Sequence, residues 1–286
     1  MSHQDLIVFG EDWGAHPSST QHLIQQLNQD RRTLWVNSIG LRRPRFNLSD
    51  LNRLVKKGKS LLYRTAPGQQ QYLRQDRPEI LQPAAIPLPG NPLAKHFNRH
   101  FLGRRIVQRC NQLGIHRPIL WTSLPTAVDM VGELNESAVV YYCGDDFNAL
   151  AGVDHQPVSR LEQQLVRRAD IILAASPKLA EKFPAEKTHL LPHGVDSDLF
   201  QTAVPAAVDL PWDRPVAGFY GSISEWFDTE LLAATAHLMP DWRFCLIGQV
   251  NTDLSVFKGI DNIELLGPRP HHRLPSYVQH WQASML

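Results

Sequence analysis

The chain of 286 residues, with 43% hydrophobic and 20% charged residues and a net charge of +1, has the composition of a globular protein with room for two domains. No apolar run approaches the roughly 20 residues of a membrane span, and the first residues do not resemble a secretory signal, so we expect a cytoplasmic protein. Three widely spaced cysteines, Cys110, Cys143 and Cys245, argue against a disulfide framework and against a cysteine metal cluster.

Charge is distributed unevenly along the chain. Residues 42–109 contain 15 Lys and Arg against 3 Asp and Glu, an excess of 12 positive charges, whereas the rest carries an excess of 11 negative charges. A segment this basic within a nearly neutral chain favours an anionic partner, and a solvated face of loops and helices is the alternative. We expect no nucleic acid partner.

Short apolar runs that end at Gly, Ser or Asp alternate with helical patterns along the whole chain. The runs lie at residues 5–10, 33–40, 118–123, 138–144, 171–176, 189–194, 216–222, 244–250 and 263–267. Continuous apolar runs of this length are typical of parallel strands buried on both faces. The alternation therefore predicts an α/β fold of the doubly wound kind.

Helix signals and proline content suggest two domains. Ser18 with Gln21 forms a capping-box pattern before an apolar stripe, and Asp228 can cap a helix that follows a later strand. Residues 201–215 are rich in proline and lack helical periodicity, so we interpret them as a linker. The predicted domains are residues 1–200 and residues 216–286.

The first strand ends in an unusual group of polar and aromatic residues, Glu11, Asp12, Trp13 and His16, at the start of a helix. In open parallel sheets, ligands bind outside the carboxyl ends of the strands. The carboxylates could orient sugar hydroxyls and the indole could stack on a sugar face, while the helix N-terminus favours an anion. The alternative is a polar loop with Trp13 packed on the core.

Two further strand ends carry candidate residues. Asp145 and Asp146 could bind Mg²⁺, accept a proton or hold a hydroxyl, or they could form an Asx turn and a helix cap. His193 could titrate near neutral pH or donate to a phosphate, or it could be a turn residue near the linker.

The expected second domain opens with a strand, a glycine-containing loop and a helix start, which suits a pyrophosphate. A tight turn between strand and helix would give the same pattern. A later segment places Arg269 where it could pair with a phosphate or a base edge. His271 and His272 are neighbours in sequence and lack further ligands, so we do not expect them to bind a metal.

Taken in order, these motifs resemble a glycosyltransferase of the GT-B fold, near glycosyltransferase family four of the bacterial exopolysaccharide and teichuronic-acid type. The resemblance rests on residues 12–14, 17–23, 35–44, 142–146, 168–176, 192–196, 218–228, 246–248 and 262–267. It implies two Rossmann-like domains, an acceptor bound mainly by the first and a UDP- or GDP-linked sugar by the second, without a metal or other cofactor.

The resemblance assigns site residues in three groups. The catalytic candidates are Asp12, His16 and Asp145. The candidates for binding the nucleotide-sugar are Gly221, Ser222, Trp226, Gly248, Arg269, Pro270 and His271. The candidates for binding a glycan or lipid-linked acceptor are Glu11, Trp13, Asp146 and His193.

One family feature is absent from the sequence. Family four carries two late glutamates separated by seven residues, and the glutamates after residue 200, Glu225, Glu230 and Glu264, are not spaced in this way. We therefore expect a second domain cut short, with an exposed sheet edge and either poor stability or association. A non-catalytic binding or scaffold protein on the same fold, and a nucleotide-sugar epimerase, remain alternatives.

The basic segment contains a possible membrane-binding helix. Its apolar positions are Leu48, Leu51, Leu54, Val55, Leu61 and Leu62, with three lysines beside them. This pattern resembles an amphipathic helix at an anionic membrane, so we expect residues 42–109 to contact the inner membrane face near a lipid-linked acceptor. An ordinary core-facing helix is the alternative.

Overall fold

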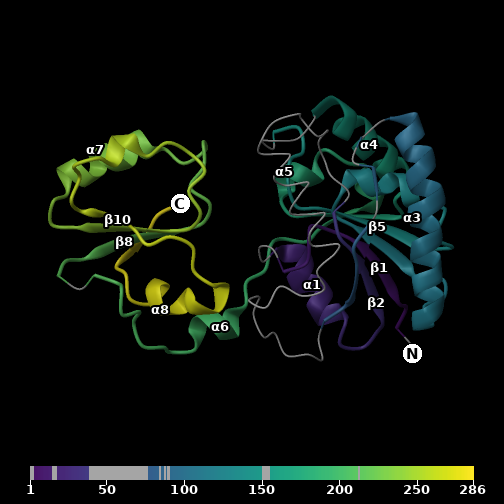
Figure 1. The fold of residues 1–286 in the computed structure, drawn as a ribbon, viewed down its shortest axis with the longest axis horizontal. Coiled ribbons are helices and arrows are strands. Elements are labelled where there is room, and N and C mark those ends of the chain that lie inside the picture. The colour runs from purple at the N-terminus through teal and green to yellow at the C-terminus, as the bar shows by residue number, and fades with distance from the viewer. Residues whose placement is uncertain are drawn as a thin grey trace. The chain divides into compact units, whose positions relative to one another are not determined.

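A computed structural model describes residues 3–14, 18–38, 77–83, 85–86, 88, 91–149, 155–211 and 213–286. The chain divides into two compact units, residues 1–194 and 195–286. Figure 1 shows both units as sheets with flanking helices. Of the helices in the described ranges, none combines the length and apolar character that a membrane crossing requires. The amphipathic pattern predicted at residues 48–62 lies outside these ranges.

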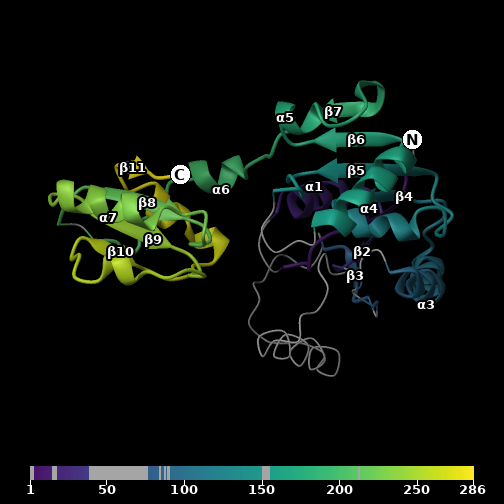
Figure 2. The same cartoon turned by 90° about the horizontal axis from the view of Figure 1, so that it is seen from above.

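The first unit is built on a parallel sheet of seven strands in the order β3-β2-β1-β4-β5-β6-β7. The strands are β1 (Leu6–Phe9), β2 (Thr33–Val36), β3 (Glu79–Leu81), β4 (Ile119–Thr122), β5 (Ala138–Cys143), β6 (Ile171–Ala174) and β7 (Thr188–Leu190). The last strand begins before the apolar run predicted at residues 189–194 and ends within it. Figure 2 views the strands of this sheet from above.

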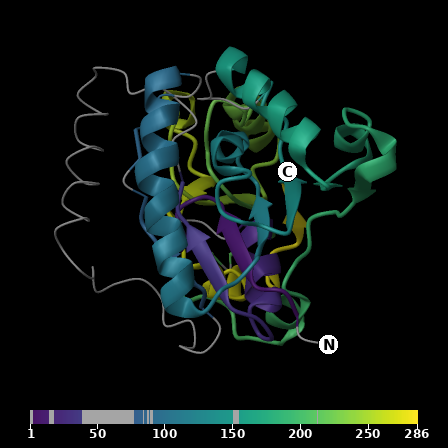
Figure 3. The ribbon, with the colours of Figure 1, turned by 90° about the vertical axis from the view of Figure 1, so that its right-hand side faces the viewer.

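Helices lie on both faces of this sheet, which explains the continuous apolar strands. The helices are α1 (Ser19–Leu27), α3 (Pro92–Leu113), a 3-10 helix (Pro125–Met130), α4 (His155–Arg168), α5 (Pro177–Ala180) and a 3-10 turn (Ala185–Lys187). Along β1, Ile7 and Phe9 join the core beneath α3 and α4, whereas Leu6 and Val8 join the core beneath α1. Figure 3 shows α3, in blue, lying against the sheet.

Helix α1 begins where the sequence predicts it. Ser18 accepts a hydrogen bond from the Gln21 N–H at 3.1 Å. The Gln21 side chain reaches past the cap, because its Oε1 accepts from the Gly14 N–H at 3.1 Å and its Nε2 donates to Glu11 at 2.8 Å. The helix start therefore also fixes the loop that follows β1.

The second unit contains a four-stranded parallel sheet in the order β10-β9-β8-β11. Its elements are α6 (Ser197–Gln201), β8 (Val216–Tyr220), α7 (Thr229–Leu238), β9 (Arg243–Ile247), a 3-10 turn (Ser255–Phe257), β10 (Ile263–Leu265), a 3-10 turn (His271–Arg273), α8 (Pro275–Val278) and β11 (Ala283–Ser284). Asp228 caps α7 by accepting from the Leu231 N–H at 2.9 Å, as the sequence predicts.

The division between the units lies before the expected linker. Ala207 and Leu210, within the proline-rich segment 201–215, are buried against strands of the second sheet. The Ala207 N–H donates to the Ser276 carbonyl at 2.8 Å, and Gln279 donates to the carbonyls of Phe200 and Thr202. The segment lacks periodicity because its backbone bonds to α8 and the turn after it instead of forming a helix of its own.

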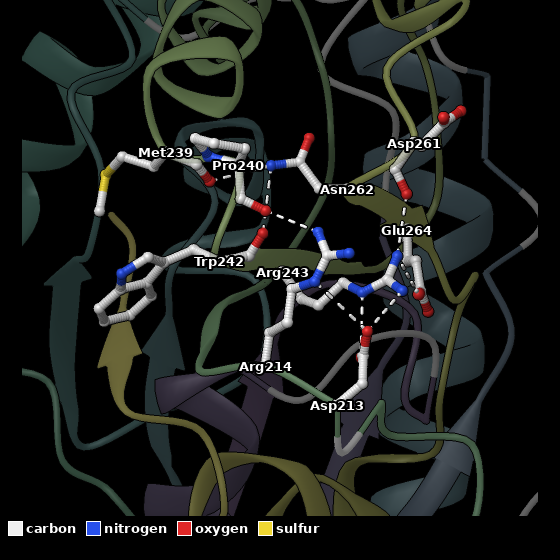
Figure 4. A network of polar contacts seen from close by, with 9 residues as sticks. All are labelled: Asp213, Arg214, Met239, Pro240, Trp242, Arg243, Asp261, Asn262 and Glu264. Atoms are coloured by element: carbon white, nitrogen blue, oxygen red, sulfur yellow. Dashed lines mark hydrogen bonds and ion pairs between the residues drawn. The ribbon is translucent and has the colours of Figure 1, made fainter.

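A network of hydrogen bonds and ion pairs joins the segments at the amino ends of the strands in the second sheet (Figure 4). The Arg243 guanidinium binds both oxygens of Asp213, at 3.1 and 2.9 Å, and donates to the Asp261 carbonyl. Asn262 directs its side-chain amide to the carbonyls of Ala236, Met239 and Trp242 at 3.0–3.1 Å. Because ligands of such sheets bind at the opposite, carboxyl ends, we interpret this network as structural.

Candidate functional site

The candidate residues of the first unit follow the carboxyl ends of its strands. The loop after β1 is held by its own polar groups, since Asp12 Oδ1 accepts from the Ser38 N–H at 3.1 Å and from the Ser38 hydroxyl at 2.9 Å. Glu11 Oε1 accepts from Ser18 Oγ and from Gln21. Both carboxylates thus have a structural role in the loop, which the sequence alone does not reveal. His16 lies outside the described residues.

Trp13 packs against the core. Its ring meets Trp35 edge-on at 4.7 Å between centroids, and its backbone N–H donates to Asn37 at 3.0 Å. The Trp35 indole in turn donates to the Glu11 carbonyl at 3.0 Å. These contacts match the alternative of a packed tryptophan, and the stacking of Trp13 on a sugar stays a prediction.

The two carboxylates after β5 differ in their surroundings. Asp146 forms an ion pair with Lys182 of 2.7 Å and accepts from the Asn148 N–H at 3.0 Å, which is an Asx-type turn. The hydrogen bond from Lys182 lowers the pKa of Asp146. Asp145 is exposed and its carboxylate has no hydrogen bond to another described residue, so it is available to a ligand.

His193 joins the start of α1 and the end of β5. Its Nδ1 lies 2.6 Å from Ser19 Oγ and 3.2 Å from the Tyr142 hydroxyl. Burial raises the pKa of Tyr142, whereas the imidazole is exposed. The arrangement of Ser19, Tyr142 and His193 can pass a proton between hydroxyls and an imidazole or bind an anion beside the helix N-terminus.

Neither Ser19 nor Tyr142 is among the predicted site residues, although both lie within motifs that carry the resemblance. Tyr142 lies within an apolar strand pattern, and Ser19 follows a stronger capping residue, so neither stands out. The available signal was topological: parallel strands β1, β5 and the segment after β7 all end at the same edge.

Glycines bring the backbone close together at the carboxyl edge of the second sheet. The Gly221 N–H donates to the Ile247 carbonyl at 2.9 Å, and the Gly248 N–H donates to the Gly267 carbonyl at 3.2 Å. A Cβ on Gly248 would lie 1.6 Å from the Gly221 oxygen. Packing of two strand ends therefore accounts for Gly248 without a ligand.

Small polar side chains cluster beside these glycines. Ser222 Oγ lies 2.7 Å from Ser224 Oγ and accepts from the Asn251 amide at 3.0 Å. Neither Ser224 nor Asn251 is among the predicted site residues: Ser224 lies in the loop expected to hold a pyrophosphate, and Asn251 follows a later strand. Together they present hydroxyl and amide groups that can bind phosphate oxygens or sugar hydroxyls. Trp226 is 61% exposed beside this loop.

Arg269 is engaged within its own unit. It donates to Asp209 at 2.6 Å and to the Tyr277 hydroxyl at 2.9 Å, and Tyr277 donates to Asp209 at 2.7 Å. The pKa of Asp209 is lowered because hydrogen bonds outweigh the effect of burial. Pro270 precedes a 3-10 turn, and the His271 ring meets Phe200 at 5.7 Å. Donor contacts by Arg269, Pro270 and His271 stay predictions.

The described residues contain no group of three or more His, Cys, Asp or Glu side chains placed to hold one metal ion. The three thiols are buried and free, and burial raises the pKa of Cys143 to about 11 and that of Cys245 to about 12. Neither thiol is a nucleophile at neutral pH.

No protein-family model matches the sequence, and no curated protein matches it significantly. Solved structures do resemble its fold. HepE from Anabaena, in complex with UDP and glucose, superposes with a TM-score of 0.63 at 15% identity, covering 99% of this chain and 73% of that one. The catalytic domain of starch synthase IV from Arabidopsis thaliana, bound to ADP and acarbose, gives 0.53 at 10% identity, covering 96% and 76%.

A protein from Listeria monocytogenes described as a UDP-N-acetylglucosamine 2-epimerase also matches, with a TM-score of 0.53 at 8% identity, covering 98% of this chain and 73% of that one. These likenesses confirm the predicted α/β fold of the GT-B class with two Rossmann-like domains. At such low identity they establish the fold and leave the activity open.

Proposed function

We propose that this protein is a glycosyltransferase that moves a sugar from a UDP- or GDP-linked donor to a glycan or lipid-linked acceptor in cell-surface polysaccharide synthesis. One observation carries the proposal. Polar side chains lie at the carboxyl ends of the strands in both parallel sheets of a chain with the GT-B fold. HepE and starch synthase IV, which share this fold, were solved with a nucleotide and a sugar.

The donor side of the proposal rests on the loop after β8. Ser222, Ser224 and Asn251 offer hydroxyl and amide groups where Gly221 and Gly248 keep the backbone close. Such groups can stabilise the charge that develops on a leaving nucleotide diphosphate, which requires no covalent intermediate. Trp226, Gly248, Arg269, Pro270 and His271 belong to the same proposed nucleotide-sugar site, with no metal.

The acceptor side rests on the strand ends of the first unit. Asp145 is exposed and available, and His193 is already hydrogen-bonded through Nδ1 to two hydroxyls. We propose Asp12, His16 and Asp145 near the reacting centre and Glu11, Trp13, Asp146 and His193 toward the acceptor. A cytoplasmic location, with peripheral contact to the inner membrane face, fits a lipid-linked acceptor.

Two assays test this function. The first is calorimetric titration with UDP, GDP and ADP. The second measures release of the nucleotide from the corresponding nucleotide-sugars in the presence of a lipid-linked acceptor. Asp145→Asn should lower turnover at least about 100-fold with donor affinity unchanged, because a group acting in proton transfer contributes this much. Ser222→Ala combined with Asn251→Ala should instead weaken donor binding about tenfold, since two hydrogen bonds are lost. Asp30→Asn is the control, because Asp30 lies in an exposed ion pair with Arg31 just before the amino end of β2.

Two alternatives have distinct outcomes in the same assay. Nucleotide binding without release or transfer would favour a non-catalytic binding or scaffold protein. Conversion of a UDP-sugar to its epimer would favour an epimerase, which the fold of the Listeria protein keeps open. Absence of binding to all three nucleotides would contradict the proposal and the epimerase alternative.

A further inference from the structure

Helix α3 is amphipathic in an unusual way. Its 22 residues include five Lys and Arg and two His but no Asp or Glu. One stripe, formed by Ala94, Leu102, Ile106 and Cys110, is buried in the core of the first unit. The inner face of the helix is therefore fully explained by packing.

A second apolar stripe lies on the outer side of the helix. Leu93, Phe97 and Phe101 follow one another at four-residue spacing and therefore share a face. Their exposed fractions are 81%, 38% and 53%, and the two phenyl rings lie 4.4 Å apart. Helices of globular proteins seldom leave three large apolar side chains in a row exposed without a partner.

The charges of α3 differ in their pairing. Lys95 pairs with Asp129 at 2.8 Å, Arg99 with Glu133, and Arg109 with Glu79. Arg104 and Arg105 have no acidic partner in the described ranges, and they follow Phe101 by three and four positions. Two guanidinium groups without an acidic partner among the described residues thus follow the exposed phenyl rings along α3.

A hollow of about 800 Å³ extends along the same helix. Its lining includes Lys95, His96, Arg99, His100 and Arg104, with Glu133 as the acidic member. Lys95 and Arg99 are paired with acidic residues, so the basic side chain that the hollow shares with the outer apolar face is Arg104.

We infer that the outer face of α3, formed by Leu93, Phe97, Phe101, Arg104 and Arg105, docks on a lipid surface that contains anionic headgroups. Phenyl rings partition into the boundary between headgroups and acyl chains, and guanidinium groups bind headgroup phosphates. Charge complementarity selects this partner, because α3 has five Lys and Arg and no acidic residue, and its Arg104 and Arg105 have no acidic partner in the described ranges.

The inference deepens the proposed function, because a lipid-linked acceptor would be reached from this surface. It is tested without turnover, so its failure would leave the nucleotide-binding assay unaffected. A face of this kind would orient the first unit with α3 toward the headgroups.

The test is cosedimentation with vesicles of phosphatidylcholine alone and of equal parts phosphatidylcholine and phosphatidylglycerol. We expect binding to the mixed vesicles at low salt, weak binding to the neutral ones, and loss of binding at high salt. Arg104→Ala with Arg105→Ala should weaken binding to the mixed vesicles about tenfold, and so should Phe97→Ser with Phe101→Ser. Both pairs are exposed, so circular dichroism should show an unchanged fold.

Matched controls remove the same groups elsewhere. Arg160→Ala with Arg167→Ala takes two exposed guanidiniums from α4, and Leu238→Ser takes an exposed apolar side chain from α7. Both should bind like the wild type. Equal binding to neutral and mixed vesicles, or equal loss in the controls, would overturn the inference. A lower melting temperature or a changed sedimentation coefficient in the phenylalanine variant would point to another chain segment or a second copy as the occupant.

Discussion

At the scale of single residues, Gly248 shows how a backbone contact constrains the second unit. Its φ is +154°, and a Cβ at this position would lie only 1.6 Å from the Gly221 oxygen, which leaves no space for a side chain. Gly248→Ala should lower the free energy of unfolding by about 1–3 kcal/mol, measured by urea titration of the second unit's transition.

Gly103→Ala is the matched control for this substitution. Gly103 lies in helix α3, and a Cβ there would meet nothing within 4 Å. Alanine should leave the stability unchanged or raise it by up to about 1 kcal/mol, because glycine is costly inside a helix. Equal destabilisation by both variants would contradict the account of Gly248.

The buried thiols predict how stability depends on pH. The thiol pKa rises from 9.0 to about 11 in Cys143 and to about 12 in Cys245, mainly because burial disfavours the thiolate. Because the thiol pKa is higher in the folded state, the contribution of the protonated thiols to the free energy of unfolding is fully present below pH 9. It is lost as the pH rises toward 11 and 12, because the unfolded chain ionises first.

Two measurements check this dependence. A thiol reagent at pH 8 should not label the native protein and should label all three cysteines after unfolding. Thermal melting should shift downward between pH 9 and pH 11, and Cys245→Ala should reduce the shift. Rapid labelling of the native protein would show that the thiols are accessible.

At the scale of elements, Asn262 connects three parts of the second unit. Its buried amide donates to carbonyls at the end of α7, in the turn after it and just before β9, and Figure 4 draws the last two of these contacts. Asn262→Ala removes the donor from all three carbonyls and should cost about 1–3 kcal/mol of stability. Asn251→Ala, at an exposed amide, should leave the melting temperature unchanged.

Arg269 allows a structural role and a donor-binding role to be separated. Asp209→Asn weakens the contact that joins the segment after α6 to α8, so it should lower the stability of the second unit by about 1 kcal/mol. Arg269→Ala should do the same, and Arg273→Ala, at an exposed position, should not. If Arg269 also contacts the donor, only its substitution will weaken nucleotide binding beyond the effect of Asp209→Asn.

At the scale of the whole molecule, two separate cores predict two unfolding transitions. Each compact unit has its own buried clusters, one set beneath the seven-stranded sheet and one beneath the four-stranded sheet. Calorimetry should resolve both transitions, and a nucleotide should raise only the midpoint of the second unit, since binding stabilises the unit that binds. A single transition, or an equal shift of both, would contradict this.

The sequence determined the fold class and the positions of most strands, because burial on both faces of a parallel sheet imposes continuous apolar runs that are local in sequence. It also located the caps at Ser18 and Asp228, which act within one turn of a helix. The boundary at residue 194 was not visible, since Ala207 and Leu210 are buried by elements that follow them by tens of residues.

Only the tertiary structure decided what the polar strand-end residues contact. In the folded chain, Asp146 forms an ion pair with Lys182, and Arg269 forms one with Asp209. Ser19 and Tyr142 contact His193 across as many as 174 positions of sequence. Periodicity and capping are short-range properties that a chain displays residue by residue. Side-chain partners depend instead on which strand ends become neighbours, and that follows from the order of strands in the sheet.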